Sequence, residues 1–102
     1  MQTGLVFQYF RNKQILDFIN RRFAADNNWT NGNCYWAARI LAARFKLKIY
    51  YLPIQGHFVC GSHHKFYDAN GIYRGTETPI LAETIQSQDP LWWSHLMRDC
   101  RD

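Results

Sequence analysis

The segment from residue 47 to residue 74 constrains the fold most strongly, because short β-prone stretches alternate there with tight turn signals. Gaps of only two to four residues separate these stretches, and Asn70-Gly71 is a strong hairpin signal. Connections this short join antiparallel neighbours, so the sequence predicts a small antiparallel sheet of three or four strands. The expected strands are Leu47–Leu52, Gly56–Cys60, Lys65–Ala69 and Ile72–Arg74.

Two helices are expected before this sheet and two after it. Residues 11–25 carry apolar side chains at helical spacing, and residues 34–45 contain four alanines, which favour a helix and allow close packing on a sheet. Thr78-Pro79 and Asp89-Pro90 each match an N-cap residue followed by a helix-starting proline. The sequence therefore predicts an α+β fold in which the helix that begins at Cys34 packs on the sheet.

The composition indicates one globular domain over residues 1–102. The chain is 47% hydrophobic and 20% charged, which excludes intrinsic disorder. No apolar run reaches the roughly 18 residues that a membrane span needs, and the first residues lack the basic start of a signal peptide. The three cysteines show no CxxC spacing, which argues against a disulfide framework. We therefore expect a cytoplasmic protein that contacts no membrane.

Cys34 lies where a predicted loop, residues 26–33, meets the second helix, and Asn33 is the expected N-cap. Free N–H groups and the positive end of the dipole at a helix N-terminus favour thiolate over thiol, and so lower the pKa of a cysteine. Cys34 is therefore the candidate nucleophile. The alternative is a small buried side chain with no chemical role.

His57 and Asp68 lie on neighbouring strands of the predicted sheet. A hairpin turn centred on Ser62-His63 places His57 directly opposite Asp68, and Cys60 opposite Lys65. The Cβ atoms of opposed side chains lie about 4.5 to 5.5 Å apart, so a carboxylate can accept a hydrogen bond from the imidazole and fix its tautomer. The pattern predicts that His57 and Asp68 are paired.

The order of these motifs resembles the papain-like cysteine peptidase superfamily, which includes the transglutaminase-like and NlpC/P60-like families. The resemblance covers residues 29–71. It rests on Asn-Gly-Asn-Cys34-Tyr-Trp-Ala-Ala at the start of a helix, then Gly-His57-Phe-Val and Phe-Tyr-Asp68-Ala-Asn-Gly on successive strands. It implies a minimal papain-like domain in which Cys34 is the nucleophile, His57 the general base and acid, and Asp68 the residue that orients the imidazole.

The mechanism implied by this resemblance needs an oxyanion hole, built from the Cys34 backbone N–H and one further donor. The position that matches the glutamine of papain is Asn28. Asn31, Asn33 and Gln55 are alternative donors. Aromatic side chains flank the nucleophile and are candidates for the walls of a substrate cleft: Trp29, Tyr35 and Trp36.

The sequence thus predicts a thiol hydrolase or acyltransferase that acts on an amide, isopeptide or thioester bond of a protein or peptide substrate, with no cofactor and no metal. Two alternatives stay open: an inert scaffold of the same fold that binds a partner protein, and a small nucleic-acid-binding protein. The 12 basic residues outnumber the 8 acidic ones, but they are scattered, so we do not expect a nucleic-acid partner. A zinc site at Cys60, His63 and His64 lacks a clear second ligand pair.

Overall fold

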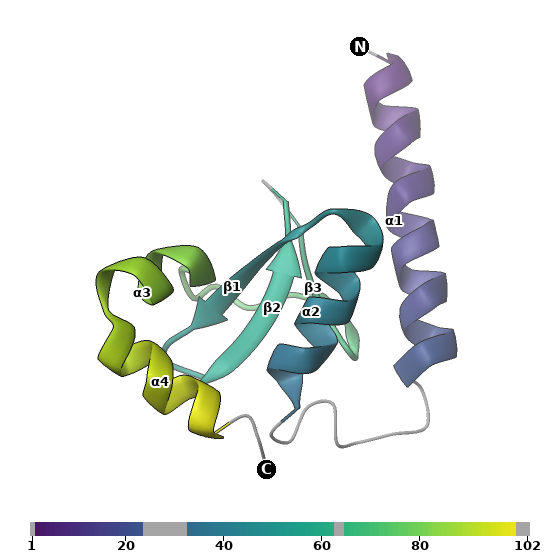
Figure 1. Cartoon of the computed structure of the whole chain (residues 1–102). Coiled ribbons are helices and arrows are strands. Elements are labelled where there is room, and N and C mark those ends of the chain that lie inside the picture. Colours follow the sequence, from purple (N-terminus) through teal and green to yellow (C-terminus); the bar gives the residue numbers. More distant parts are fainter. Residues whose placement is uncertain (1, 24–32, 63–64, 100–102) are drawn as a thin grey trace.

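A computed structural model describes residues 2–23, 33–62 and 65–99, with side chains from residue 9 onward in the first helix. These residues form an α+β fold in which helices pack on a five-stranded antiparallel sheet, so the predicted fold class is confirmed (Figure 1). The strand order is β4-β3-β2-β1-β5. The elements are α1 (Gln2–Phe23), α2 (Cys34–Phe45), β1 (Lys48–Leu52), β2 (His57–Gly61), β3 (Phe66–Asp68), β4 (Gly71–Tyr73), β5 (Ile80–Leu81), α3 (Ala82–Gln88) and α4 (Pro90–Asp99).

The hairpin between β2 and β3 has a different register from the predicted one. Cys60 pairs with Tyr67, so the predicted pairing of Cys60 with Lys65 is wrong by two residues. The reason is that Gly61 continues the strand. A Cβ atom at Gly61 would lie 2.2 Å from the carbonyl oxygen of Lys65, so glycine permits this close approach. The Ser62 N–H then donates to the Lys65 carbonyl at 3.2 Å.

This shift leaves the two site residues on the same face of the sheet. A slip of one residue would move every side chain of a strand to the other face, whereas a slip of two restores each face. Extending the observed register places Val59 opposite Asp68, so His57 and Asp68 are diagonal neighbours. His57 is the first residue of β2 and Asp68 is the last of β3, so both lie at the same end of the sheet.

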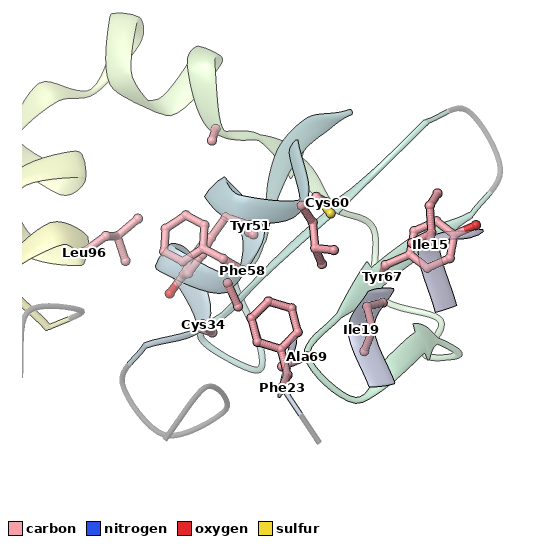
Figure 2. Packing of buried hydrophobic residues seen from close by; sticks show 14 of the residues in the cluster. Ile15, Ile19, Phe23, Cys34, Tyr51, Phe58, Cys60, Tyr67, Ala69 and Leu96 are labelled. Atoms are coloured by element: carbon pink, nitrogen blue, oxygen red, sulfur yellow. The ribbon is translucent and has the colours of Figure 1, made fainter. Parts of the chain in front are cut away.

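The two N-terminal helices supply one side of the core (Figure 2). The α2 helix occupies the predicted range, and the small side chains of Ala37 and Ala38 are buried where it contacts β2. The α1 helix begins nearer the N-terminus than predicted, and it buries Ile15, Ile19 and Phe23. Among the described helices, none has an apolar stretch long enough to cross a membrane.

The C-terminal half confirms one predicted helix start and corrects the other. Asp89-Pro90 does open α4, and Oδ1 of Asp89 accepts a hydrogen bond from the Trp92 N–H at 3.2 Å. Thr78-Pro79 does not open α3, which begins only at Ala82. The residues between them instead form β5, because the outer edge of β1 offers backbone partners there.

Residues 74–79, here called the strap, connect the two opposite edges of the sheet. Since β4 and β5 lie at these edges, the connection must span four strand spacings, or roughly 19 Å. The seven residue steps from Tyr73 to Ile80 reach at most about 25 Å. The strap therefore has little slack, and it runs behind the strands as a pale green trace (Figure 1).

Candidate active site

His57 and Asp68 form an ion pair at the end of the sheet. Nε2 of His57 lies 2.9 Å from Oδ2 of Asp68, and each side chain is only 15% exposed. The predicted hydrogen bond is thus present, although the two residues are not directly opposed. Diagonal neighbours on one face of a sheet are within reach of side chains of this length.

The second carboxylate oxygen of Asp68 is also engaged. Oδ1 accepts a hydrogen bond from the backbone N–H of Asn70 at 2.8 Å, within the tight turn between β3 and β4. Because one oxygen binds the turn and the other binds the imidazole, the plane of the carboxylate is fixed. Asp68 therefore holds His57 in one orientation.

Cys34 completes this arrangement from the other side. It is the first residue of α2 and is 7% exposed. Its side chain forms a hydrogen bond with the imidazole of His57. Nε2 of His57 contacts Asp68, so Nδ1 is the ring nitrogen left for the sulfur. The side chains of Cys34, His57 and Asp68 thus form one hydrogen-bonded series.

The expected capping of α2 by Asn33 is wrong in one respect. Asn33 occupies the N-cap position, and its carbonyl accepts a hydrogen bond from the Ala37 N–H at 3.1 Å, but its side chain makes no capping hydrogen bond. Its backbone torsions, φ −108° and ψ 16°, lie outside the extended region that capping side chains require. The first turn of α2 therefore takes no hydrogen bond from this amide.

The environment of His57 raises its pKa from 6.5 to about 9. The hydrogen bond to Asp68 is the largest cause, and the hydrogen bond to Cys34 is the second, while burial acts in the opposite direction. The imidazole is therefore protonated at neutral pH. An imidazolium beside a sulfur at a helix N-terminus favours the thiolate form of that sulfur.

Glu77 in the strap holds the turn that leads into His57, and the sequence analysis missed it. Its carboxylate accepts hydrogen bonds from the backbone N–H groups of Ile54 and, at 3.3 Å, of Gln55. Gly56 completes the turn with φ +65°, where glycine is favoured. No sequence signal indicates this role, because Glu77 follows His57 by 20 residues, in a stretch without helical or strand periodicity.

The predicted oxyanion donors and cleft walls have mixed outcomes. Gln55 donates from Nε2 to the hydroxyl of Tyr73 at 2.8 Å, so its side-chain amide is hydrogen-bonded to the last residue of β4. Tyr35 packs edge to face against Phe58 and Trp93 and is half-buried, so it belongs to the core. Trp36 is 38% exposed and stays a candidate wall. Three further predicted site residues lie outside the described residues: Asn28, Trp29 and Asn31.

The other cysteines differ from Cys34. Cys60 is fully buried, and burial, with a smaller contribution from the charge of Asp68, raises its pKa to about 12. Cys60 therefore stays protonated. The third cysteine, Cys100, lies outside the described residues. Two of the three residues of the alternative zinc site, His63 and His64, also lie outside them. Within the part of the chain that the structure describes, no group of three or more His, Cys, Asp or Glu side chains could hold a metal ion.

The fold and these three side chains define a class: an α+β protein with a cysteine, histidine and aspartate series at the N-terminus of a helix. The model of one family, the Phage YunG-like protein family, matches residues 10–97. The chain therefore belongs to the Phage YunG-like family. No curated protein and no solved structure matches it.

The resemblance to papain-like cysteine peptidases is wrong as a family assignment. It rested on the order of short motifs in residues 29–71, whereas the matching family covers most of the chain and is not a papain-like peptidase family. Cysteine, histidine and carboxylate side chains converge in the same arrangement on unrelated folds, so their order along a chain does not identify a family. The chemistry available to the site therefore follows from its geometry and not from a family name.

Proposed function

We propose that the protein is a thiol hydrolase or acyltransferase in which Cys34 is the nucleophile, His57 the general acid and base, and Asp68 the residue that orients the imidazole. One observation carries this proposal: the hydrogen-bonded series from Cys34 through His57 to Asp68, with the thiol in the first turn of a helix. Its geometry matches the general pattern of a nucleophile, a base and an orienting group.

The chemistry proceeds in two steps. The thiolate of Cys34 attacks the carbonyl carbon of an amide, isopeptide or thioester bond, and backbone N–H groups in the first turn of α2 stabilise the oxyanion. The imidazolium of His57 gives its proton to the leaving group, and an acyl thioester on Cys34 remains. Neutral His57 then takes a proton from water, which releases the acid, or from an amine, which forms a new amide.

The raised pKa of His57 supports this sequence of events. A histidine with a pKa of about 9 carries the proton that the leaving group needs at neutral pH. After it has given up that proton, it becomes the base for the second step. The same positive charge stabilises the thiolate before substrate binds.

The proposed substrate is a protein or peptide, and the proposed compartment is the cytoplasm. Cys34 and Cys60 are both free thiols, which is typical of proteins in a reducing compartment.

Labelling with iodoacetamide, followed by mass spectrometry of each cysteine peptide, tests the proposal. A small reagent is needed because Cys34 is mostly buried. We expect Cys34 to be labelled fastest at pH about 6, where an ordinary thiol with a pKa of about 8.5 is almost fully protonated. Faster labelling of Cys60 or Cys100 at that pH would contradict the thiolate assignment.

Hydrolysis of p-nitrophenyl acetate then separates an enzyme from an inert scaffold. We expect an acetyl group to appear on Cys34 and Cys34→Ala to abolish turnover without unfolding the chain, because loss of one thiol removes little volume. Cys60→Ala is the matched control and should retain turnover. If the protein does not hydrolyse the ester and Cys34→Ala leaves every biological effect of the protein intact, the inert-scaffold alternative is correct.

A further inference from the structure

A cleft of about 630 Å³ lies between α1 and the C-terminal end of α2. It is not part of the candidate active site. Cys34 begins α2 and the cleft lies at the other end of the same helix, roughly 16 Å away along the axis. Four cationic residues line this cleft: Arg11, Arg21, Arg44 and Lys46. Asp17 and Phe45 line it as well.

Local contacts orient the three arginines of this cleft. The guanidinium of Arg11 donates to the carbonyl oxygen of Phe45, and Nε of Arg21 donates to the carbonyl oxygen of Asp17 at 3.3 Å. The guanidinium of Arg44 lies 5.4 Å from the centre of the Phe18 ring. Each contact uses only part of a guanidinium, which has five N–H donors, so further donors point to solvent or to a ligand.

The positive charge of the cleft is not balanced within the described part of the chain. No carboxylate there forms an ion pair with any of the four cations. Asp17 contributes one negative charge, and the C-terminal end of α2 contributes roughly half of one. The cleft therefore keeps more than two positive charges, which is much of the net +4 of the whole chain. A concave site with this excess attracts an anion.

We propose that this cleft binds a nucleotide, either free or within single-stranded nucleic acid. Arginine guanidinium groups match phosphate geometry, and several of them converge here. Phe45 lines the same cleft and is partly exposed, and its ring packs edge to face against the Phe18 ring that Arg44 contacts, so aromatic rings lie beside the cations. Aromatic rings beside cations are the combination that binds bases and phosphates together. The volume also lies in the usual range for small-ligand sites.

This proposal does not depend on the candidate active site, because no cleft residue belongs to the hydrogen-bonded series. It differs from the expectation, drawn from the scattered basic residues, that nucleic acid is not a partner. The basic residues are scattered along the sequence, but folding gathers four of them where α1 lies beside the C-terminal end of α2. Arg11 and Arg21 come from α1, Arg44 from α2, and Lys46 follows α2 directly.

Titration of the full chain tests the proposal with three probes at about 50 mM salt: ATP, a fluorescein-labelled oligothymidylate of about 12 nucleotides, and tripolyphosphate. ATP or the oligothymidylate should bind saturably, and the tighter of the two identifies the source of the nucleotide. Arg21→Gln and Arg44→Gln should each weaken binding about tenfold, the loss expected for one charge-assisted contact. Asp17→Asn should strengthen it a few fold, because it removes the repulsive carboxylate.

Arg74→Gln is the matched control, since it removes one exposed cation from the strap and should change affinity less than twofold. Equal weakening by Arg74→Gln and Arg21→Gln would overturn the proposal, because binding would then reflect only net charge. Absence of saturable binding by both ATP and the oligothymidylate would also overturn it. If tripolyphosphate binds as tightly as ATP, the cleft recognises phosphate alone and the assignment of a nucleotide is wrong.

Discussion

The charged side chains at the two ends of α2 differ in burial and in pairing. At the N-terminal end, the imidazole and carboxylate are mostly buried and meet in one hydrogen-bonded series with the thiol. At the C-terminal end, four cations are exposed to solvent and none is paired with a described carboxylate. Buried charges couple strongly to one another, whereas exposed charges are screened by water and salt. Substitutions at the N-terminal end should therefore have large, non-additive effects, and those at the other end small, additive ones.

Among the substitutions that test this difference between the two ends of α2, Asp68→Asn should have the largest effect. The two oxygens of Asp68 accept from Asn70 and from His57, and an amide has only one oxygen, so one of these donors would face an NH₂ group. We expect kcat/KM to fall by roughly a hundredfold or more, as when the orienting group of other triads is replaced, and the pKa of His57 to fall towards its ordinary value. Asp68→Ala should cost more. Steady-state kinetics and NMR titration of His57 measure both effects.

Asp89→Asn is the matched control for this substitution. Asp89 uses Oδ1 to cap α4, so the amide oxygen of asparagine can replace it. We expect little change in activity or stability. Equal losses for Asp68→Asn and Asp89→Asn would show that Asp68 has only a structural role.

The next effect concerns stability and pH. Because the pKa of His57 is raised in the folded state from 6.5 to about 9, its contribution is fully present below pH 6.5 and is lost as the pH rises through about 9. The free energy of unfolding should therefore fall by about 3 kcal/mol more in the native chain than in His57→Gln over this interval. Urea unfolding at several pH values measures the difference. Parallel curves for the two proteins would contradict the raised pKa.

Glu77 should have a smaller effect on the same site. Glu77→Ala removes the acceptor for two backbone N–H groups of the turn before His57, so the imidazole would lose part of its fixed position. We expect kcat to fall about tenfold with KM nearly unchanged, since misplacing a catalytic group weakens the chemical step. Glu83→Gln, on the exposed first turn of α3, is the control and should be neutral. A lower melting temperature with unchanged kcat would instead limit Glu77 to structural support.

These residues also show how far the sequence could predict the molecule. The alanine pattern located α2 and its first residue, Cys34, because helix propensity and turn signals are local. The pairing of His57 with Asp68 survived an error of two residues in the register, because two is the period of a strand. Glu77 and the cationic cleft could not be predicted, because both depend on which distant segments pack together. No local pattern encodes that information.

The cleft should give the smallest effects on folding stability and the strongest dependence on salt. Arg21→Gln removes one of several cations that repel one another, but it also removes a cation from the last turn of α1, so it should change the free energy of unfolding by no more than about 0.5 kcal/mol. Asp17→Asn should lower the free energy of unfolding by a similarly small amount, because it removes the carboxylate that faces these cations. Both effects should vanish at about 1 M salt, where the screening length falls to about 3 Å. The effect of Asp68→Asn should persist at that salt concentration, because the partners of Asp68 are mostly buried. Urea unfolding at low and high salt distinguishes the two ends. If the Arg21→Gln effect is large or independent of salt, Arg21 contributes to the packing of α1 on α2. That result would contradict the claim that the charges at the C-terminal end of α2 have only small, screened effects.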